Sequence, residues 1–383
     1  MEPFTVAVPD DVLVDLRERL SRTRWPAEFP AGWDYGTEPG YLRELCAYWE
    51  RDYDWRHWER ELNRWPHVIG ELDTAVGPER IHAIHARSPH EDALPLIITH
   101  GWPGSVFEMW KVIDPLVNPT AHGGSASDAF HVVCPSIGGY GFSGGTRHRG
   151  FSCATQAEAN DALMRALGYE RYGCQGGDWG SIISMQMGMH HPERLVGVHL
   201  TMVPPTPGEE HLATLTGEET ERLAALGSFQ EHETGYQRIQ GTRPMTLAYG
   251  LSDSPAGLAG WIVEKFRVWS DCDGDVESVF SKDELLTNIS IYWVTNTIGS
   301  SIRLYYETFK LGAAMIPSVD HRIDVPVGVA VFPKEIMRSS RRFAERVMNV
   351  VHWTEHDSGG HFAALERPTE LVEDLRTFFR PLR

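Results

Sequence analysis

The spacing of apolar positions divides the chain into regions with different periods. Short continuous apolar runs, such as LPLIITH, AFHVVCPS and RLVGVHLTMV, alternate with segments of helical spacing between residues 91 and 203. The runs VPVGVAVF and VVHWTEH resume this pattern after residue 317. A run that is apolar on both faces is typical of a central parallel strand. The alternation predicts an α/β fold with a doubly wound, mostly parallel sheet.

The alternation stops between residues 204 and 316, where the pattern is mostly helical. Proline-bearing segments, MVPPTPGEE and AAMIPSVD, bound this stretch. Ligands in open α/β sheets bind at the carboxyl ends of the strands, so an inserted helical block is expected to cover that edge as a lid. We therefore expect four parts: a helical N-terminal lobe (1–90), the first part of the core (91–203), the lid (204–316) and the second part of the core (317–383).

The first lobe is rich in Trp, Arg and Glu. PDDVLVDLRERLSRTRW predicts an amphipathic helix, with Asp10 or Asp11 near its N-cap and Val12, Leu13 and Leu16 on one face. YLRELCAYWERDYDWRHWERELNRW predicts further helix. We see no chemistry in this lobe and interpret it as packing material.

Charge and cysteine content narrow the class of protein. The formal net charge is -18, which argues against nucleic-acid binding, since that needs a basic surface. The five cysteines have no metal-ligand spacing, so we expect free thiols in the cytoplasm. The first residues, MEPFTVAVPDDVLVDL, carry early acids and no long apolar run, so we expect neither a signal peptide nor a membrane anchor.

The stretch QGGDWGS, residues 175–181, lies between a predicted strand and a predicted helix. Glycines on both sides of one reactive residue are typical of the sharp turn on which hydrolases present a nucleophile. Here that residue is Asp178, at a helix N-terminus where the dipole favours its anionic form. The alternative interpretation is that Asp178 only caps the helix.

A nucleophile needs a base and a residue that orients the base. His361, in DSGGHFAALERP, follows the last predicted strand, where the histidine of such a triad falls in chain order. Glu335, in VPVGVAVFPKEIM, lies just past the preceding strand and is the favoured acid. Asp357 is a less favoured alternative, and Asp320 and Asp324 precede the strand, at the opposite edge of the sheet.

An oxyanion would need backbone N–H donors near Asp178. HGWPGS, residues 100–105, follows the strand LPLIITH and could supply the amide of Trp102, while Trp179 could supply the second amide.

Six motifs in one order, HGWPGS, GGDWGS, GYQRIQ, RLYYE, FPKE and GGHFAALE, resemble the microsomal-type epoxide hydrolases of the α/β-hydrolase fold. The likeness covers nearly the whole chain. It implies that Asp178 is the nucleophile, His361 the base and Glu335 its acid partner. It also implies two lid tyrosines, Tyr236 and Tyr305, with the adjacent Tyr306 less favoured. Animal members carry an N-terminal membrane anchor that this sequence does not show, so it resembles a soluble bacterial member.

The resemblance implies hydrolysis of an epoxide by water to a vicinal diol, without metal or organic cofactor. Aromatic lid residues favour a bulky or aromatic epoxide, and bacterial relatives include enzymes of antibiotic biosynthesis, enediynes among them. Two other functions remain open: a haloalkane dehalogenase with the same nucleophile, and a non-catalytic ligand-binding protein. The sequence leaves the oligomeric state open, a homodimer included.

Overall fold

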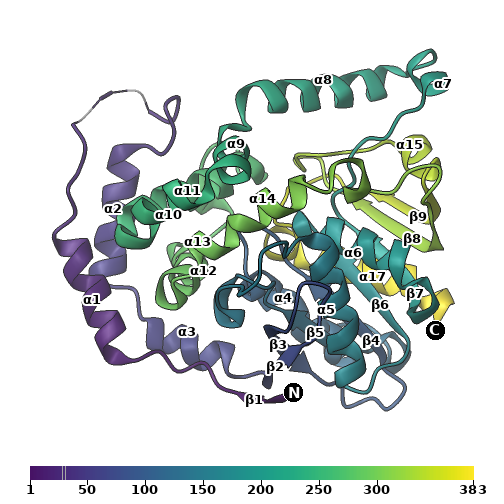
Figure 1. The fold of residues 1–383 in the computed structure, drawn as a ribbon, viewed down its shortest axis with the longest axis horizontal. Helices are drawn as coiled ribbons and strands as arrows, with labels where there is room; N and C mark the ends of the chain where they lie inside the picture. Colours follow the sequence, from purple (N-terminus) through teal and green to yellow (C-terminus); the bar gives the residue numbers. More distant parts are fainter. Residues whose placement is uncertain (28, 31) are drawn as a thin grey trace.

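A nine-stranded mixed sheet runs through the computed structural model, which describes residues 1–27, 29–30 and 32–383 (Figure 1). The strand order is β1-β2-β3-β5-β4-β6-β7-β8-β9. The six strands β5-β4-β6-β7-β8-β9 pair in parallel. The strands β1, β2 and β3 add an antiparallel edge. The strands are β1 (Glu2–Phe4), β2 (His67–Leu72), β3 (Glu79–Ala86), β4 (Leu94–Thr99), β5 (Phe130–Pro135), β6 (Tyr172–Gly176), β7 (Leu195–Leu200), β8 (Ile323–Val331) and β9 (Met348–Glu355).

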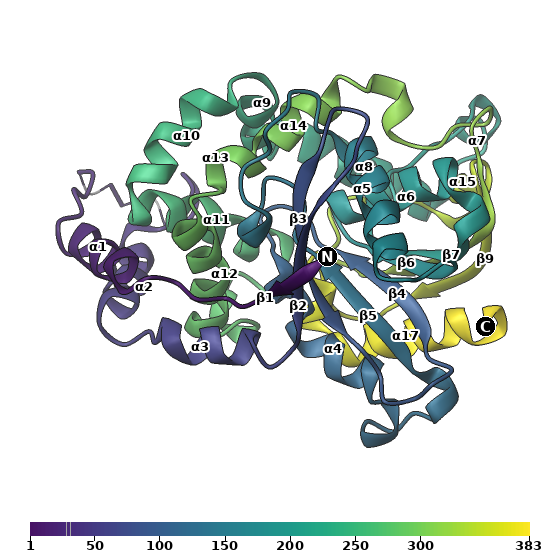
Figure 2. The same cartoon turned by 60° about the horizontal axis from the view of Figure 1, so that its bottom comes forward.

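Helices cover both faces of the parallel part, which confirms the predicted doubly wound α/β-hydrolase architecture (Figure 2). One face carries α5 (Cys153–Ala166) and α6 (Trp179–His190), and the other carries α4 (Trp110–Val117) and α17 (Pro368–Phe379). Glycines in β7 and β8 allow α17 to approach closely, because a Cβ at Gly197 or Gly328 would lie 2.9 or 2.7 Å from the ring of Phe378. Because Gly197 and Gly328 have no side chain, α17 can lie close to the sheet.

Between β7 and β8 the chain leaves the sheet and forms a block of helices. These are α7 (Glu209–Leu212), α8 (Gly217–His232), α9 (Gly235–Thr242), α10 (Pro244–Asp253), α11 (Pro255–Trp269), α12 (Lys282–Thr295), α13 (Ile298–Ser301) and α14 (Arg303–Phe309). Helix α8 extends along the top of Figure 1, away from the other lid helices. Its first turns are tied to the core by ion pairs from Arg222 to Glu355 (2.7 Å) and from Arg342 to Glu219 (2.6 Å).

The N-terminal lobe packs against the lid. Its helices α1 (Asp10–Ser21), α2 (Pro39–Arg51) and α3 (Trp55–Leu62) lie beside α11 and α12 (Figure 1). The indole N–H of Trp49 donates to the hydroxyl of Ser290 (3.0 Å), and the hydroxyl of Thr37 donates to the carbonyl of Gly260 (2.6 Å). The lobe thus supports the lid from the side opposite the sheet.

The N-terminal lobe expected to be helical over residues 1–90 also contains β1, β2 and β3, which belong to the sheet. The run IHAIHA, residues 81–86, has the apolar pattern of a strand and forms most of β3, whereas no such pattern marks β1 or β2. β1 has only three residues, and β2 begins with the buried His67, which hydrogen-bonds His82 (2.8 Å) instead of continuing an apolar pattern.

The remaining short helices are α15 (Arg341–Glu345) and α16 (Ala363–Glu366). Over the described part of the chain, no helix combines the length and apolarity that a bilayer crossing requires.

Candidate active site

The turn after β6 presents Asp178 in a strained backbone conformation. Its φ of 49° and ψ of -128° lie in a region that costs a non-glycine residue on the order of 1–3 kcal/mol. Two glycines make the turn sterically possible. A Cβ at Gly176 would lie 2.0 Å from the carbonyl oxygen of Gly180, and a Cβ at Gly180 would lie 1.8 Å from that of Thr99. The GGDWGS spacing therefore follows from backbone contact on both sides of the aspartate.

The carboxylate of Asp178 has a different partner on each oxygen. The backbone N–H of Trp102 donates to Oδ1 (2.8 Å), and Nε2 of His361 lies 3.3 Å from Oδ2. The N–H of Trp179, the first residue of α6, has no acceptor within its own helix. The two amides predicted for an oxyanion site thus lie on the loop after β4 and at the start of α6, beside the carboxylate.

Glu335 lies behind the imidazole of His361, on the side away from Asp178. Its Oε1 is 2.7 Å from His361 Nδ1 and also accepts the N–H of Ile336 (2.6 Å). The loop of His361 is held by its backbone, since the N–H of His361 donates to the carbonyl of Trp269 (2.9 Å). The structure therefore brings Asp178, His361 and Glu335 into one line, whereas Asp357 is exposed.

The charges around His361 favour its protonated form. Burial opposes protonation, but the carboxylates of Glu335 and Asp178 outweigh it and raise the pKa of His361 well above the usual value. In the resting site the imidazolium is therefore held between two carboxylates.

Two further buried carboxyl groups near His361 were not predicted from the sequence. Burial raises the pKa of Glu108 to about 8 and that of Glu366 to about 7. Glu366 accepts the N–H groups of Phe362 (2.9 Å) and Asp271 (2.8 Å), which ties the His361 loop to the end of α11. Glu366 is the last residue of the GGHFAALE motif, but the sequence assigned it no role, and Glu108 lies outside the six motifs.

The lid places two tyrosines opposite the carboxylate. Tyr236 on α9 and Tyr305 on α14 are buried and line, with Asp178, a cavity of about 120 Å³, here named the catalytic cavity. Tyr306, the less favoured alternative, is 38% exposed and does not line the catalytic cavity. The rest of the lining is mostly apolar and includes Ile182, Met202, Pro204, Phe309, Met315, Ile316, Ile336 and Met337.

Trp102 and Trp179 contact both Asp178 and the lid tyrosines. The ring of Trp102 stacks on Tyr236 at 5.4 Å between centroids, and the ring of Trp179 meets Tyr305 edge-on at 4.7 Å. Their backbone amides lie beside Asp178, while their rings position the lid tyrosines.

Both tyrosines remain protonated at ordinary pH. Burial raises the pKa of Tyr236 and of Tyr305 well above the usual value, and the negative charge of Asp178 raises both further. Each therefore offers an O–H donor to the cavity. The side chain of Gln237 donates to the hydroxyl oxygen of Tyr236 (2.9 Å), which leaves the phenolic hydrogen free to point elsewhere.

A reactive residue on a strand–turn–helix, with a histidine and an acid on later loops and a helical lid between β7 and β8, defines the α/β-hydrolase class of enzymes. Family models agree with this class. Residues 1–109 match the model described as epoxide hydrolase N terminus, and residues 95–238 match that of the alpha/beta hydrolase fold.

Full-length relatives define the family more closely. The chain is 45% identical to a protein of Stigmatella aurantiaca provisionally named an epoxide hydrolase, covering 100% of this chain and 85% of the relative. It is 35% identical to epoxide hydrolase 1 of Sus scrofa, over 99% and 88% of the two chains. The crystal structure of juvenile hormone epoxide hydrolase from Bombyx mori superposes with a TM-score of 0.90 at 29% identity, over 100% and 94%. The chain belongs to the microsomal-type epoxide hydrolase family, and it is an enzyme.

Proposed function

We propose that the protein hydrolyses an epoxide to a vicinal diol through a covalent ester on Asp178. The observation that carries this proposal is the pair of contacts on one carboxylate: the Trp102 amide on Oδ1 and His361, backed by Glu335, on Oδ2. Such an arrangement holds a nucleophile, an oxyanion donor and a base around a single carbon atom.

In the first step, the Asp178 oxygen not held by Trp102 attacks a ring carbon of the epoxide. The bond between that carbon and the ring oxygen breaks, and the electron pair goes to the oxygen. Tyr236 and Tyr305 polarise the ring oxygen by hydrogen bonding, and one of them transfers its proton. The product is a hydroxyalkyl ester of Asp178.

Ester formation prepares the base for the second step. It removes the negative charge of Asp178, one of the two that raise the pKa of His361, so the imidazolium becomes easier to deprotonate. The proton it releases replaces, through solvent, the one given up by the tyrosine. His361 is then neutral and oriented by Glu335, and it can accept a proton from water.

In the second step, water loses a proton to His361 and attacks the carboxyl carbon of the Asp178 ester. The resulting oxyanion is stabilised by the amides of Trp102 and Trp179. When the intermediate collapses, the alkyl oxygen leaves with the proton from His361, and the diol is released. The proton that remains on the Asp178 carboxyl group passes to His361, which restores the carboxylate and the imidazolium. A carboxylate suits this sequence because it forms an ester, whereas a serine would form an ether that water does not readily cleave.

The lining of the catalytic cavity supports an epoxide with an apolar or aromatic group next to the ring. The cavity of about 120 Å³ is small beside the roughly 300–1,000 Å³ of typical ligand pockets. A bulky substrate would therefore extend past the lid residues or displace them.

A single-turnover experiment in heavy-oxygen water tests the mechanism. With enzyme in excess over styrene oxide, the first diol should contain an oxygen from Asp178 and no solvent label. Label in that first diol would mean direct attack by water and would overturn the ester mechanism. The variant His361→Gln should accumulate the ester, visible as a mass increase of one styrene oxide on the protein.

A second reaction, displacement of a halide by Asp178, is favoured by one observation. The indole N–H groups of Trp102 and Trp179 are buried and have no acceptor among the described residues, and such donors could hold a leaving halide. Two tyrosine hydroxyls nevertheless suit a leaving oxygen better. Chloride release from a chloroalkane, with no diol from styrene oxide, would favour this second function.

A further inference from the structure

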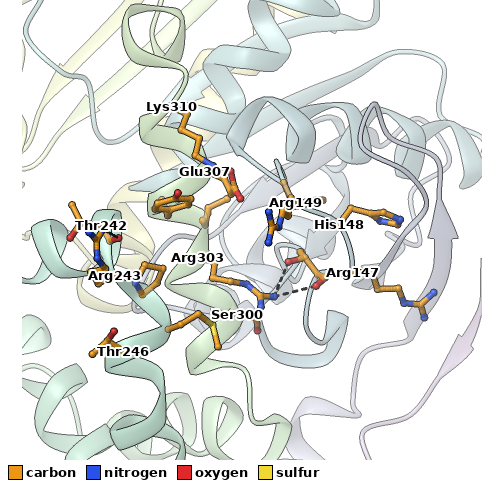
Figure 3. A pocket seen from close by; sticks show the side chains of 17 residues that line it. Arg147, His148, Arg149, Thr242, Arg243, Thr246, Ser300, Arg303, Glu307 and Lys310 are labelled. Atoms are coloured by element: carbon orange, nitrogen blue, oxygen red, sulfur yellow. Dashed lines mark hydrogen bonds and ion pairs between the residues drawn. The ribbon is translucent and has the colours of Figure 1, made fainter.

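Two further hollows lie along the lid beyond the catalytic cavity. A groove of about 1050 Å³, here named the lid groove, is lined by Gln237 and Phe309, which also line the catalytic cavity. At its other end Thr242, Arg243 and Thr246 are shared with a pocket of about 600 Å³, here named the basic pocket (Figure 3). The shared residues place the catalytic cavity, the lid groove and the basic pocket in a row along α9 and α14, here named the path.

Arginines without carboxylate partners line this path. Arg238 and Arg243 come from α9 and its end, Arg303 from the start of α14, and Arg149 from the loop before α5. In the part of the chain that the structure describes, none of the four forms an ion pair, and Arg303 donates only to Thr146, at 3.1 and 3.2 Å. Figure 3 shows Arg149 and Arg303 in the middle of the basic pocket, with Arg243 on its other side.

The other charged residues of the basic pocket are already neutralised. Lys310 pairs with Glu307 at 2.6 Å, and the guanidinium of Arg147 pairs with Glu71 at 2.7 Å. Nδ1 of His148 lies 3.0 Å from the carboxylate of Glu79. The excess positive charge of the path therefore belongs to the four unpaired arginines.

The local positive charge differs in sign from the charge of the whole chain, which has 53 acidic and 35 basic residues. Four arginines that converge on one path without a carboxylate partner form a cationic track on an anionic protein. Guanidinium groups bind carboxylate and phosphate through two parallel N–H donors, which suits them to recognise an oxyanion.

We propose that the substrate is an amphipathic epoxide whose far end carries an oxyanion, a carboxylate or a phosphate, held by Arg149 and Arg243. This inference rests on the proposed function, because it places the epoxide against Asp178. The apolar body of the substrate lies in the lid groove, and its charged end lies in the basic pocket. The anion compensates guanidinium groups that the protein itself leaves unpaired.

Helix geometry gives the length of such a substrate. Tyr236 and Arg243 are seven residues apart along α9 and its C-cap, a rise of about 10 Å at 1.5 Å per residue. The distance between the epoxide ring and the anionic group should therefore be on the order of 10 Å. Shorter molecules would reach Asp178 without reaching the arginines.

The test uses terminal epoxides that carry a carboxylate on alkyl chains of increasing length, each paired with its methyl ester. An exposed ion pair changes binding by up to about fivefold, so two arginines should give a preference of roughly tenfold in kcat/KM for the carboxylate at the matching length. Sodium chloride at 1 M should reduce the preference, because it screens exposed charges. An epoxide of the same length that carries a phosphate is compared with the carboxylate, and the higher kcat/KM shows which oxyanion the enzyme prefers.

Variants identify the residues responsible. In the double variant Arg149→Gln/Arg243→Gln the ratio of kcat/KM for carboxylate over ester should fall close to one. The single variant Arg149→Gln should lower this ratio about threefold. It replaces the double variant in the test if the double variant does not fold. Arg171→Gln is the matched control, because Arg171 is exposed, forms no ion pair among the described residues and precedes β6, at the opposite edge of the sheet.

The two proposals fail in different ways. If the wild-type enzyme turns over neither member of any pair, nor styrene oxide, the proposed function is wrong. If it turns over the methyl esters but shows no preference for the carboxylate or phosphate at any length, the oxyanion inference is overturned. A preference that persists in the double variant would equally overturn it, because the charge would then be recognised elsewhere.

Discussion

The two halves of the active site are held by different kinds of interaction. On the sheet side, Asp178, His361 and Glu335 are positioned by backbone: glycines in contact with carbonyls, and N–H groups that bind specific oxygens. On the lid side, Tyr236 and Tyr305 are positioned by ring contacts with Trp102 and Trp179. Backbone interactions leave few alternative arrangements, whereas ring packing tolerates small shifts. The sheet side therefore suits bond formation, and the lid side suits adaptation to a substrate.

This difference predicts that the sheet side is the more sensitive to substitution. The largest effect should come from Asp178→Ala, which removes the group that forms the ester. We expect kcat for styrene oxide to fall by about 10⁴-fold or more, as for other nucleophiles that act as part of a unit. The melting temperature should be measured beside kcat, because the substitution also removes the acceptor of the Trp102 N–H and one of the two carboxylates around His361. Residual activity within tenfold of wild type would show that water attacks directly.

On the lid side, the expected losses are smaller. Tyr305→Phe and Tyr236→Phe should each lower kcat by about 100-fold, because the remaining hydroxyl still polarises the ring oxygen. The double variant should lose more than either single variant. Tyr306→Phe, next to Tyr305 but outside the catalytic cavity, should change kcat for styrene oxide less than twofold. If Tyr306→Phe were the more damaging, the second acid would have been assigned to the wrong residue.

The protonation of His361 depends on the carboxylates of both Glu335 and Asp178. Its pH dependence should show how much Asp178 contributes. Asp178→Asn removes one of the two carboxylates that raise the pKa of His361, so the pKa should fall relative to wild type. Because the folded-state pKa is raised, the stabilisation from His361 is fully present below its unfolded value of about 6.5 and is lost as pH rises through the folded value. That loss should occur at lower pH in Asp178→Asn.

Histidine-ring NMR spectra of both proteins, with His361→Gln to assign the signal, would measure this shift. The hydrolytic half-reaction should correspondingly become faster with rising pH, as His361 loses its proton. An identical titration in wild type and Asp178→Asn would mean that Glu335 alone controls the imidazole.

The smallest effect concerns how the lid is supported. Ser290→Ala leaves the buried indole N–H of Trp49 without its acceptor, which should lower the free energy of unfolding by about 1–2 kcal/mol. The value of kcat should stay within about twofold, since the bond joins the N-terminal lobe to α12 and does not reach the cavity. Urea unfolding of this variant, beside the exposed control Ser228→Ala, measures it. A large loss of kcat would instead show that the lobe positions the lid tyrosines.

The sequence predicted the sheet side of the active site more directly than the lid side. The turn around Asp178, and the positions of His361 and Glu335 after late strands, follow from local spacing and from the order of elements in the sheet. Tyr236 and Tyr305 were predicted only through the family resemblance, because a tyrosine on a lid helix has no local pattern that separates a hydroxyl donor from a packing ring. Glu108 lies in none of the six motifs, and Glu366 closes the GGHFAALE motif without any local pattern that assigns it a role.

The sequence by itself determined the doubly wound sheet and the nucleophile turn, because both depend on neighbours within a few residues: apolar runs, glycines and helix starts. Tertiary structure alone decided three other features. It brought β1 to the sheet edge by pairing it with β2, more than sixty residues further along the chain. It also buried Tyr305, which the family resemblance had favoured over Tyr306, and it left four arginines along one path with no carboxylate partner among the described residues. Each of these depends on which surfaces meet when lid, lobe and sheet pack together.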